Sequence, residues 1–206
     1  MNKLILIFVA LLLSCGDSKP KSLTIPQGAT VLILGDSLSY GTGANTGEDY
    51  PSLLAKSTNW NIINEGVPGE TSAGGLARLP DLLAKHQPKL LIVELGGNDL
   101  LRQVSPTEIA QNLNDILALA NTQSVQTVLV AIPEINPLKA TFGDLSDHPL
   151  YESIALNTST PLISDVFSDV LSDKNLRSDQ IHANAKGYDE VAKRLTEKLK
   201  ELGFAK

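Results

Sequence analysis

Apolar residues follow two different patterns along this chain, and the patterns alternate from residue 31 onward. Short unbroken apolar runs are typical of strands that are buried on both faces of a parallel sheet. Longer segments with apolar residues three and four positions apart are typical of helices that pack one face against such a sheet. Strands that alternate with helices predict one α/β domain with a doubly wound parallel sheet of about five strands.

The predicted strands are residues 31–34, 61–64, 89–95, 125–132 and 161–164. The predicted helices are residues 50–57, a segment around residues 76–83 that ends near Pro88, a segment from Ser105 to Ala120, and a segment that follows Asn184 and reaches Leu202. Ser105 begins its helix with the spacing of a capping box, and Pro80 predicts a kink in the second helix. Residues 133–148, with three prolines up to Pro149, predict an irregular lid or wall.

The first residues have a different pattern. An apolar run from Leu4 to Leu13 follows Lys3 and leads into Cys15. Ten apolar residues are too few to span a bilayer of about 30 Å, but they suit the apolar centre of a signal peptide. Leu12-Leu13-Ser14-Cys15 resembles a bacterial lipoprotein signal, which implies lipidation of Cys15. The alternative is a buried core cysteine behind an ordinary signal peptide.

We therefore expect residues 1–15 to be a signal peptide with a lipobox, residues 16–28 a flexible tether and residues 29–206 the folded domain. This arrangement predicts a protein that is exported to a bacterial cell envelope and held on a membrane by its amino-terminal lipid anchor, facing the periplasm or the cell surface.

Composition narrows the function classes. Of 206 residues, 42% are hydrophobic and 19% are charged, which is typical of a globular domain and argues against disorder. The net charge of -6 gives no electrostatic basis for binding nucleic acid, and the chain has no Lys/Arg run that could hold an anionic membrane. A single cysteine excludes an internal disulfide and a cysteine-rich zinc site.

Glycine stands beside hydrogen-bonding side chains at three strand or loop ends: Gly35-Asp36-Ser37, Gly66 to Gly69, and Gly96-Gly97-Asn98. In a parallel sheet such ends converge on one edge, where open α/β sheets place their ligands. Ser37 could act as a nucleophile, with its own N–H, the Gly69 N–H and the Asn98 amide as donors to an oxyanion. Each residue also has an ordinary explanation as a turn or cap residue.

A serine nucleophile needs a base, and the chain contains three histidines. His86 stands near the end of a predicted helix and is expected to be solvated. His148 follows Asp147, but adjacent side chains usually diverge, and Asp144 is only a loose alternative partner. A carboxylate beside the imidazole would fix its tautomer and stabilise its positive form.

His182 follows Asp179 by three residues, a spacing that lets the carboxylate fold over one turn and accept a hydrogen bond from the ring. For His182 taken alone, a solvated loop histidine is the favoured interpretation. Together with the three glycine-rich ends, His182 is the favoured base.

These segments also carry a family resemblance. Gly35 to Ser39, the Gly69 turn, Gly96 to Asp99 and Asp179 to His182 resemble, in order, the four sequence blocks of the GDSL, or SGNH, hydrolase family. Residues 69–80 and 93–99 look especially like its bacterial thioesterase I, lysophospholipase L1 and arylesterase branch. The resemblance runs from about residue 30 to residue 202 and implies a flavodoxin-like three-layer α/β/α sandwich.

By this resemblance Ser37 is the nucleophile, Asp179 and His182 complete a triad, and Ser37, Gly69 and Asn98 form the oxyanion hole. We therefore expect a metal-free serine esterase, without a cofactor, that acts as a monomer on a small-molecule or lipid ester through an acyl-enzyme. Aryl esters, lysophospholipids and thioesters all remain open as substrates. The other functions left open are a non-catalytic surface lipoprotein that binds acylated ligands and a carbohydrate O-acetyl esterase on the same fold.

Some residues depart from known patterns. Ala183 follows His182 where the family usually has proline, and residues 134–151 have no confident match in the family. Ser39 stands where the elbow of the ordinary α/β-hydrolases has its second glycine, which disfavours that fold. The first turn also lacks both Gly-x-Gly-x-x-Gly and the Lys-Ser/Thr pair of a phosphate loop, which argues against a nucleotide-binding sheet.

Overall fold

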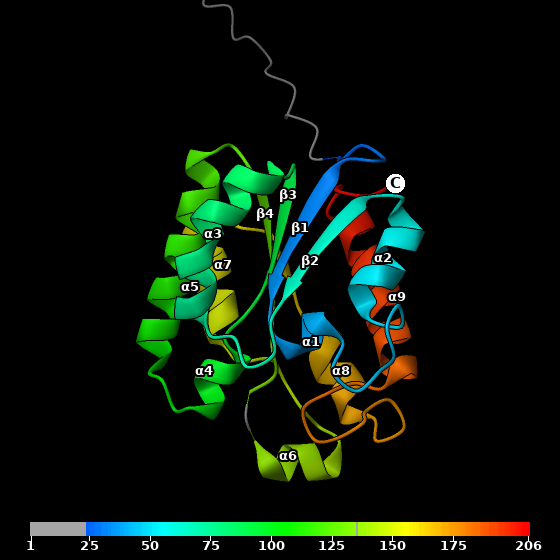
Figure 1. The fold of residues 1–206 in the computed structure, drawn as a ribbon. Coiled ribbons are helices and arrows are strands. Elements are labelled where there is room, and N and C mark those ends of the chain that lie inside the picture. Colours follow the sequence, from blue (N-terminus) through cyan, green and yellow to red (C-terminus); the bar gives the residue numbers. More distant parts are fainter. Residues whose placement is uncertain (1–23, 135) are drawn as a thin grey trace, which may run out of the picture.

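The computed structural model describes residues 24–134 and 136–206, which form a three-layer α/β/α sandwich (Figure 1). In this part of the chain five parallel strands pair in the order β2-β1-β3-β4-β5. Their bounds are Thr30–Gly35 (β1), Asn61–Gly66 (β2), Leu90–Glu94 (β3), Gln126–Val130 (β4) and Leu162–Ile163 (β5). The predicted flavodoxin-like sheet is confirmed, since this strand order is the flavodoxin order.

Helices cover both faces of the sheet (Figure 1). One face carries α2 (Tyr50–Thr58), α8 (Val166–Ser172) and α9 (Ala185–Glu201). The other carries α3 (Ser72–His86), α5 (Pro106–Thr122) and α7 (Leu150–Thr158). The short helices α1 (Ser37–Tyr40), α4 (Gly97–Leu101) and α6 (Pro137–Phe142) lie near the carboxyl edge of the sheet.

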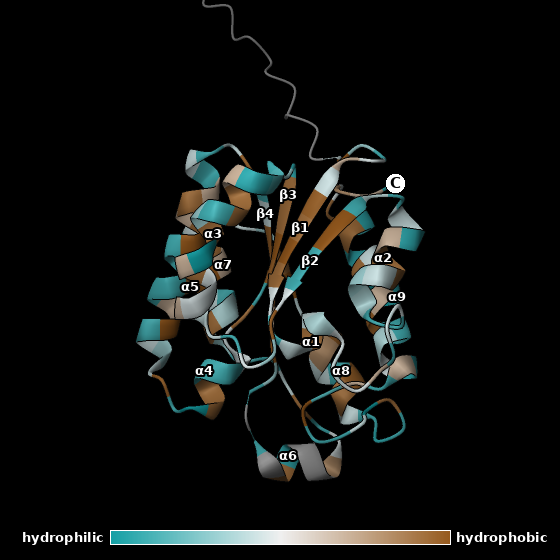
Figure 2. Cartoon of the chain, in the orientation of Figure 1, coloured by the Kyte–Doolittle hydropathy of each residue, from teal (hydrophilic) through white to brown (hydrophobic). Residues whose placement is uncertain are grey.

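The apolar run of β1 explains why the sheet is central. Val31 and Ile33 point into the core under α2, α8 and α9, whereas Leu32 and Leu34 point into the core under α3, α5 and α7. All four side chains are fully buried. A strand buried on both faces needs apolar residues at every position, and Figure 2 shows β1 and β3 as hydrophobic strands between helices of mixed hydropathy.

Predicted helix signals also hold. Ser105 Oγ accepts from the Glu108 N–H at 3.2 Å at the start of α5, and Asn184 Oδ1 accepts from the Gly187 N–H at 3.1 Å at the start of α9. Pro80 lies inside α3, which continues beyond it to His86.

The prediction missed the short helices α1, α4 and α6, and it also missed α7 and α8. Residues 133–148 are not irregular throughout, because they contain α6 and because Pro133 and Asp147 pair as an antiparallel bridge. Helix α8 is only seven residues long, too short for an apolar period to stand out in the sequence.

The folded domain begins earlier than predicted. The expected tether of residues 16–28 is wrong for residues 24–28, because Ile25 is buried with only 4% of its surface exposed. The Ile25 N–H donates to the Phe204 carbonyl at 2.8 Å, and Trp60 Nε1 donates to the Ile25 carbonyl at 3.3 Å. The predicted signal peptide and the lipidation at Cys15 lie outside the described residues. Within the described ranges, no helix has the length and apolar content needed to cross a membrane.

Candidate active site

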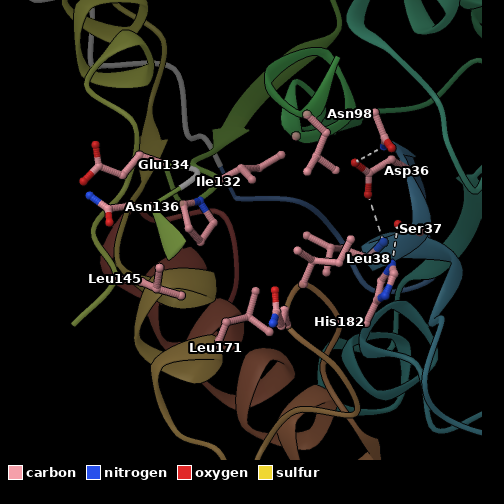
Figure 3. A pocket seen from close by; sticks show the side chains of 15 residues that line it. Asp36, Ser37, Leu38, Asn98, Ile132, Glu134, Asn136, Leu145, Leu171 and His182 are labelled. Carbon is pink, nitrogen blue, oxygen red and sulfur yellow. Dashed lines mark hydrogen bonds between the residues drawn. The ribbon is translucent and has the colours of Figure 1, made fainter. Parts of the chain in front are cut away.

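Three predicted catalytic residues meet at the carboxyl edge of the sheet. Ser37 begins α1 directly after β1, and His182 lies in the loop before α9 (Figure 3). His182 Nε2 lies 2.9 Å from Ser37 Oγ, and His182 Nδ1 lies 2.7 Å from Asp179 Oδ2. A carboxylate, an imidazole and a hydroxyl are therefore joined in one hydrogen-bonded line. This line can move a proton from the hydroxyl to the ring.

Asp179 is held as an anion, and about half of its side chain is exposed. Partial burial alone would raise the pKa of this carboxyl. Hydrogen bonds from the His182 ring and from the backbone N–H groups of Ile181 and His182 outweigh burial, so the pKa lies below its usual value. An ionised Asp179 fixes the tautomer of the ring and stabilises it when it becomes positive.

The loop that carries His182 is closed on itself. Arg177 and Ala183 form an antiparallel bridge, and the Ser178 N–H donates to the His182 carbonyl at 2.9 Å. Ala183 is fully buried and leaves the triad geometry intact although proline is usual at this position in the family that the chain resembles.

Gly43 packs closely against this loop, a role that the sequence analysis missed. Its φ is +100°, and a Cβ on it would lie 2.4 Å from the Ala183 carbonyl oxygen. Only glycine fits both the left-handed backbone and the close approach of the loop.

The nucleophile turn is supported from below by a buried carboxyl. Glu94, at the end of β3, accepts hydrogen bonds on Oε2 from Ser39 Oγ at 2.6 Å and from the Ser39 N–H at 3.1 Å. Tyr50 OH lies 2.6 Å from Ser39 Oγ. A Cβ at Gly35 would lie 2.1 Å from Ser39 Oγ, so this glycine makes room for the network. Glu94 was missed, although its signal is a charged residue at the end of an otherwise apolar strand.

Burial controls the charge of the two carboxyls under the nucleophile. Burial raises the pKa of Glu94 well above its usual value, and the negative charge of Asp36 raises it further, which favours the neutral acid. Burial also raises the pKa of Asp36 to about 6, although a hydrogen bond from the Leu38 N–H opposes this. Asp36 is the cap of α1, because its Oδ1 accepts from the Leu38 N–H at 2.9 Å.

Two of the predicted oxyanion donors, Asn98 and Gly69, differ in their position relative to the cavity beside Ser37. Asn98, in α4, lines the same cavity as Ser37, and its Nδ2 donates to Asp36 Oδ2 at 2.9 Å (Figure 3). The second hydrogen of this amide remains for another acceptor. Gly69 lies in the turn between β2 and α3 with φ +80°, and its carbonyl accepts from Arg102 at 2.9 Å. It does not belong to the described residues that line the cavity.

Asp99 ties two of these segments together and was also missed as a structural residue. It is buried, and its carboxylate accepts from the Ser72 N–H at 2.8 Å and from Ser72 Oγ at 2.6 Å. The start of α3, just after the Gly69 turn, is thereby fixed to α4, which carries Asn98.

A cavity of about 160 Å³ opens beside Ser37 and His182. Figure 3 shows Ser37 and His182 at one end, and Glu134, Asn136 and Leu145 at the other. The walls between them are mainly apolar. They include Leu38, Leu101, Ile132, Pro133, Leu171 and Ile181. An apolar slot beside a hydrogen-bonded serine can hold an acyl group with its carbonyl at the hydroxyl.

The other two histidines lie away from Ser37 in the described structure, and neither lines this cavity. The prediction that His86 is solvated is wrong: its side chain is only 16% exposed, and its Nε2 lies 3.6 Å from Glu65 Oε1. His148 Nδ1 accepts from the Leu150 N–H at 3.2 Å, and burial lowers its pKa. Within residues 24–134 and 136–206, no cluster of three or more His, Cys, Asp or Glu residues could hold a metal ion.

Comparison with known proteins agrees with this geometry. The model of the GDSL-like lipase/acylhydrolase family matches residues 33–190. The chain is 34% identical over 181 residues to thioesterase 1/protease 1/lysophospholipase L1 of Escherichia coli, and the match covers 84% of each protein. It is 40% identical over 108 residues to esterase TesA of Pseudomonas aeruginosa, where the match covers 50% of this chain and only 54% of that protein.

The fold is also similar to those of solved esterase structures. The psychrotrophic esterase EstA from Pseudoalteromonas sp., in a structure inhibited by monoethylphosphonate, superposes with a TM-score of 0.74 at 27% identity. That match covers 84% of this chain and 98% of EstA. A crystal structure of TesA also gives a TM-score of 0.74, at 30% identity, with 84% of this chain and 99% of TesA covered.

Proposed function

The chain belongs to the GDSL-like lipase/acylhydrolase family, and from this premise we propose that it hydrolyses small-molecule esters through an acyl-enzyme formed on Ser37. The observation that carries the proposal is the line of hydrogen bonds from Asp179 through His182 to Ser37, at 2.7 and 2.9 Å. The names of its relatives, which are esterases, a thioesterase and a lysophospholipase, support the same reaction class.

In the first half-reaction, Ser37 Oγ attacks the ester carbonyl while His182 Nε2 takes the hydroxyl proton. Asp179 stabilises the resulting imidazolium. The negative oxygen of the tetrahedral intermediate accepts from the Ser37 N–H, the Gly69 N–H and the free hydrogen of the Asn98 amide. The intermediate collapses, His182 gives its proton to the leaving alcohol, and the acyl group remains on Ser37.

In the second half-reaction a water molecule takes the place of the alcohol. His182 removes a proton from this water, which attacks the acyl carbonyl and forms a second tetrahedral intermediate at the same donors. Its collapse breaks the bond to Ser37 Oγ, and His182 returns the proton to the serine. The products are a carboxylic acid, an alcohol and the original enzyme.

The test is labelling and turnover with matched serine variants. We expect the wild-type protein to react with a fluorophosphonate probe and to hydrolyse p-nitrophenyl butyrate, and Ser37→Ala to lose both properties. Ser57→Ala, which changes a serine on the surface of α2, is the control and should behave like wild type. Labelling that persists in folded Ser37→Ala would contradict the assignment of the nucleophile.

We also propose that residues 1–15 direct export and that Cys15 carries a lipid, because the run from Leu4 to Leu13 suits a signal peptide and a cysteine follows it. In a bacterial host, the wild-type protein should incorporate a labelled fatty acid and sediment with membranes. Cys15→Ala should lose the label while it keeps esterase activity. A wild-type protein that sediments without label would count against lipidation.

A further inference from the structure

The segments at the ends of β1 and β3 carry different parts of the proposed machinery. Residues 35–39 hold Ser37 with its N–H, and residues 94–98 hold the Asn98 amide. Strands β1 and β3 pair side by side up to their last residues, so the two segments leave the sheet together. The contacts that fix one segment to the other therefore set the distance between these two oxyanion donors.

Two crosslinks join the segments, one on each side of Ser37 in the chain. Before Ser37, Asp36 Oδ2 accepts from Asn98 Nδ2 at 2.9 Å (Figure 3). After it, Ser39 donates to Glu94 Oε2 through its Oγ at 2.6 Å and through its N–H at 3.1 Å. The Asp36 N–H lies 3.5 Å from the same glutamate oxygen. Glu94 thus holds the backbone on both sides of the nucleophile.

The hydrogen bonds around Ser39 have one consistent order of donors. Ser39 Oγ carries a single hydrogen, which it donates to Glu94, so the Tyr50 hydroxyl at 2.6 Å is the donor to Ser39. Glu94 Oε2 therefore receives two hydrogens from Ser39 and needs none of its own. A carbonyl oxygen of a neutral carboxylic acid is sufficient for this role.

The second carboxyl oxygen decides the charge of Glu94. The residue is fully buried, and within the described ranges its Oε1 has no hydrogen-bond partner. An ionised carboxyl would leave negative charge on this oxygen away from water, which costs far more than leaving a neutral hydroxyl there. The charge of Asp36 acts in the same direction. The geometry therefore places a proton on Oε1.

Titratable groups face Glu94 from four elements of the fold. Asp36 directly precedes α1, and Tyr50, Tyr151 and Tyr188 lie in α2, α7 and α9. Burial raises the pKa of each tyrosine, so all three stay uncharged at neutral pH. Of these four groups only Asp36 ionises. A second anion beside it would repel the negative charge that develops on the substrate in the transition state.

We propose that Glu94 keeps its proton and, as a neutral acid, sets the spacing between the Ser37 N–H and the Asn98 amide in the oxyanion hole. This inference rests on the proposed function of Ser37. Glu94 is a positioning residue, because it acts through Ser39 and does not touch the reacting atoms. Its loss weakens binding of the transition state and leaves binding of the ester in the ground state almost unchanged.

The test measures kcat and KM for p-nitrophenyl butyrate in four variants of the full-length protein. Glu94→Leu removes the acceptor and keeps the site filled. Glu94→Gln is also neutral, and its carbonyl can accept both bonds from Ser39 while its amide nitrogen takes the place of Oε1. Ser39→Ala removes one of the two bonds and keeps the backbone N–H. Leu195→Ala is the control, because it opens a gap in the core under α9 and does not line the cavity.

The kcat of Glu94→Leu should fall roughly 10²-fold, the effect of a displacement of about 1 Å in an active site, and KM should change little. Ser39→Ala should lower kcat by up to about tenfold, the effect of one lost hydrogen bond. Glu94→Gln should keep most of the wild-type kcat. Leu195→Ala should lower the stability and leave kcat unchanged.

Infrared spectroscopy reads the proton on Glu94 directly. At pH 8, where Asp36 is ionised, the wild-type spectrum should contain the carbonyl stretch of a protonated carboxyl. Glu94→Gln should lack this band. A role of Glu94 in packing alone would not require the band.

A wild-type spectrum without this band, or a Glu94→Gln variant as slow as Glu94→Leu, would overturn the inference, because Glu94 would then act as an anion. A folded Glu94→Leu variant with wild-type kcat, or with a loss in KM alone, would also overturn it and leave the esterase proposal intact. If Glu94→Leu does not fold, an unchanged kcat in Ser39→Ala overturns it instead. If wild type neither hydrolyses the ester nor reacts with a fluorophosphonate, the inference and the proposed function both fail.

Discussion

Replacing Asp36 by asparagine should change how the stability of the protein depends on pH. Asp36 is buried, with 2% of its surface exposed, and its pKa in the fold is about 6 against the usual 3.8. Between these two values the folded chain binds more protons than the unfolded chain, so the folded state loses stability as the pH rises. The stabilising contribution is complete below about pH 4 and is lost as the pH passes through about 6.

The size of this effect follows from the shift in pKa. One pKa unit corresponds to about 1.4 kcal/mol, so the ionisation of Asp36 lowers the free energy of unfolding by about 3 kcal/mol between pH 4 and pH 7. An asparagine side chain cannot ionise, and the Asp36→Asn variant should lack this decrease. Glu94 and His182 also face Asp36, and both remain in the variant.

Activity should fall at the same time. The carboxylate of Asp36 accepts from both the Leu38 N–H and Asn98 Nδ2. An asparagine amide can replace only one of these acceptors and would direct its own N–H₂ group at Asn98. If the Asn98 amide then turns away from the cavity, kcat should fall by up to roughly 10²–10³, the cost of one lost oxyanion donor in a protease.

The assay is urea unfolding at several pH values from 4 to 8, together with kcat for p-nitrophenyl butyrate. Asp189→Asn on the surface of α9 is the control and should follow the wild-type curve. The free energy of unfolding of Asp36→Asn minus that of wild type should increase as the pH rises. Parallel curves for the two proteins would refute the reasoning, because Asp36 would then ionise in the fold as easily as in the unfolded chain.

Three further predictions follow from contacts around the site. Asn98→Ala should keep the fold and lower kcat for p-nitrophenyl butyrate by roughly 10²–10³, and near-normal turnover would exclude Asn98 as an oxyanion donor. Gly43→Ala should displace the loop at Ala183 and lower both activity and fluorophosphonate labelling, whereas Gly47→Ala, where a Cβ meets nothing within 4 Å, should lower them far less. Ile25→Ala should lower the free energy of unfolding by about 2–5 kcal/mol in a chain that starts at residue 24, and a smaller loss would show that residues 24–28 contribute little to the domain.

The strands and the catalytic segments could be predicted because their signals are local. β1 and β3 are unbroken apolar runs, and the caps at Ser105 and Asn184 mark the starts of their helices. Asp179 and His182 are three residues apart, a spacing that allows the contact seen in the structure, and the other glycine-rich segments were needed to favour it over a solvated loop histidine. The contact between Ser37 and His182 joins residues 145 positions apart, and the parallel sheet together with the family resemblance was needed to predict it.

The features that were missed depend on tertiary contacts. The buried position of Glu94 is tolerated because Ser39 and Tyr50 lie beside it, and no pattern in the sequence shows that they meet. The order in residues 133–148 likewise comes from contacts between distant positions, such as that of Leu145 with Ser172. The sequence predicts that Ile25 belongs to a polar tether, because it does not show that Trp60 and Phe204 lie next to Ile25 in the fold.

The hydrogen bond between Ile25 and Phe204 has a consequence for how the molecule can be oriented. It places both ends of the described chain at the amino edge of the sheet, and the cavity opens at the opposite edge (Figure 1). A domain immobilised through either end, on a bead or beneath a fusion partner, would turn its entrance toward the solvent. Substrates supplied from bulk solution would then reach the serine without passing the support.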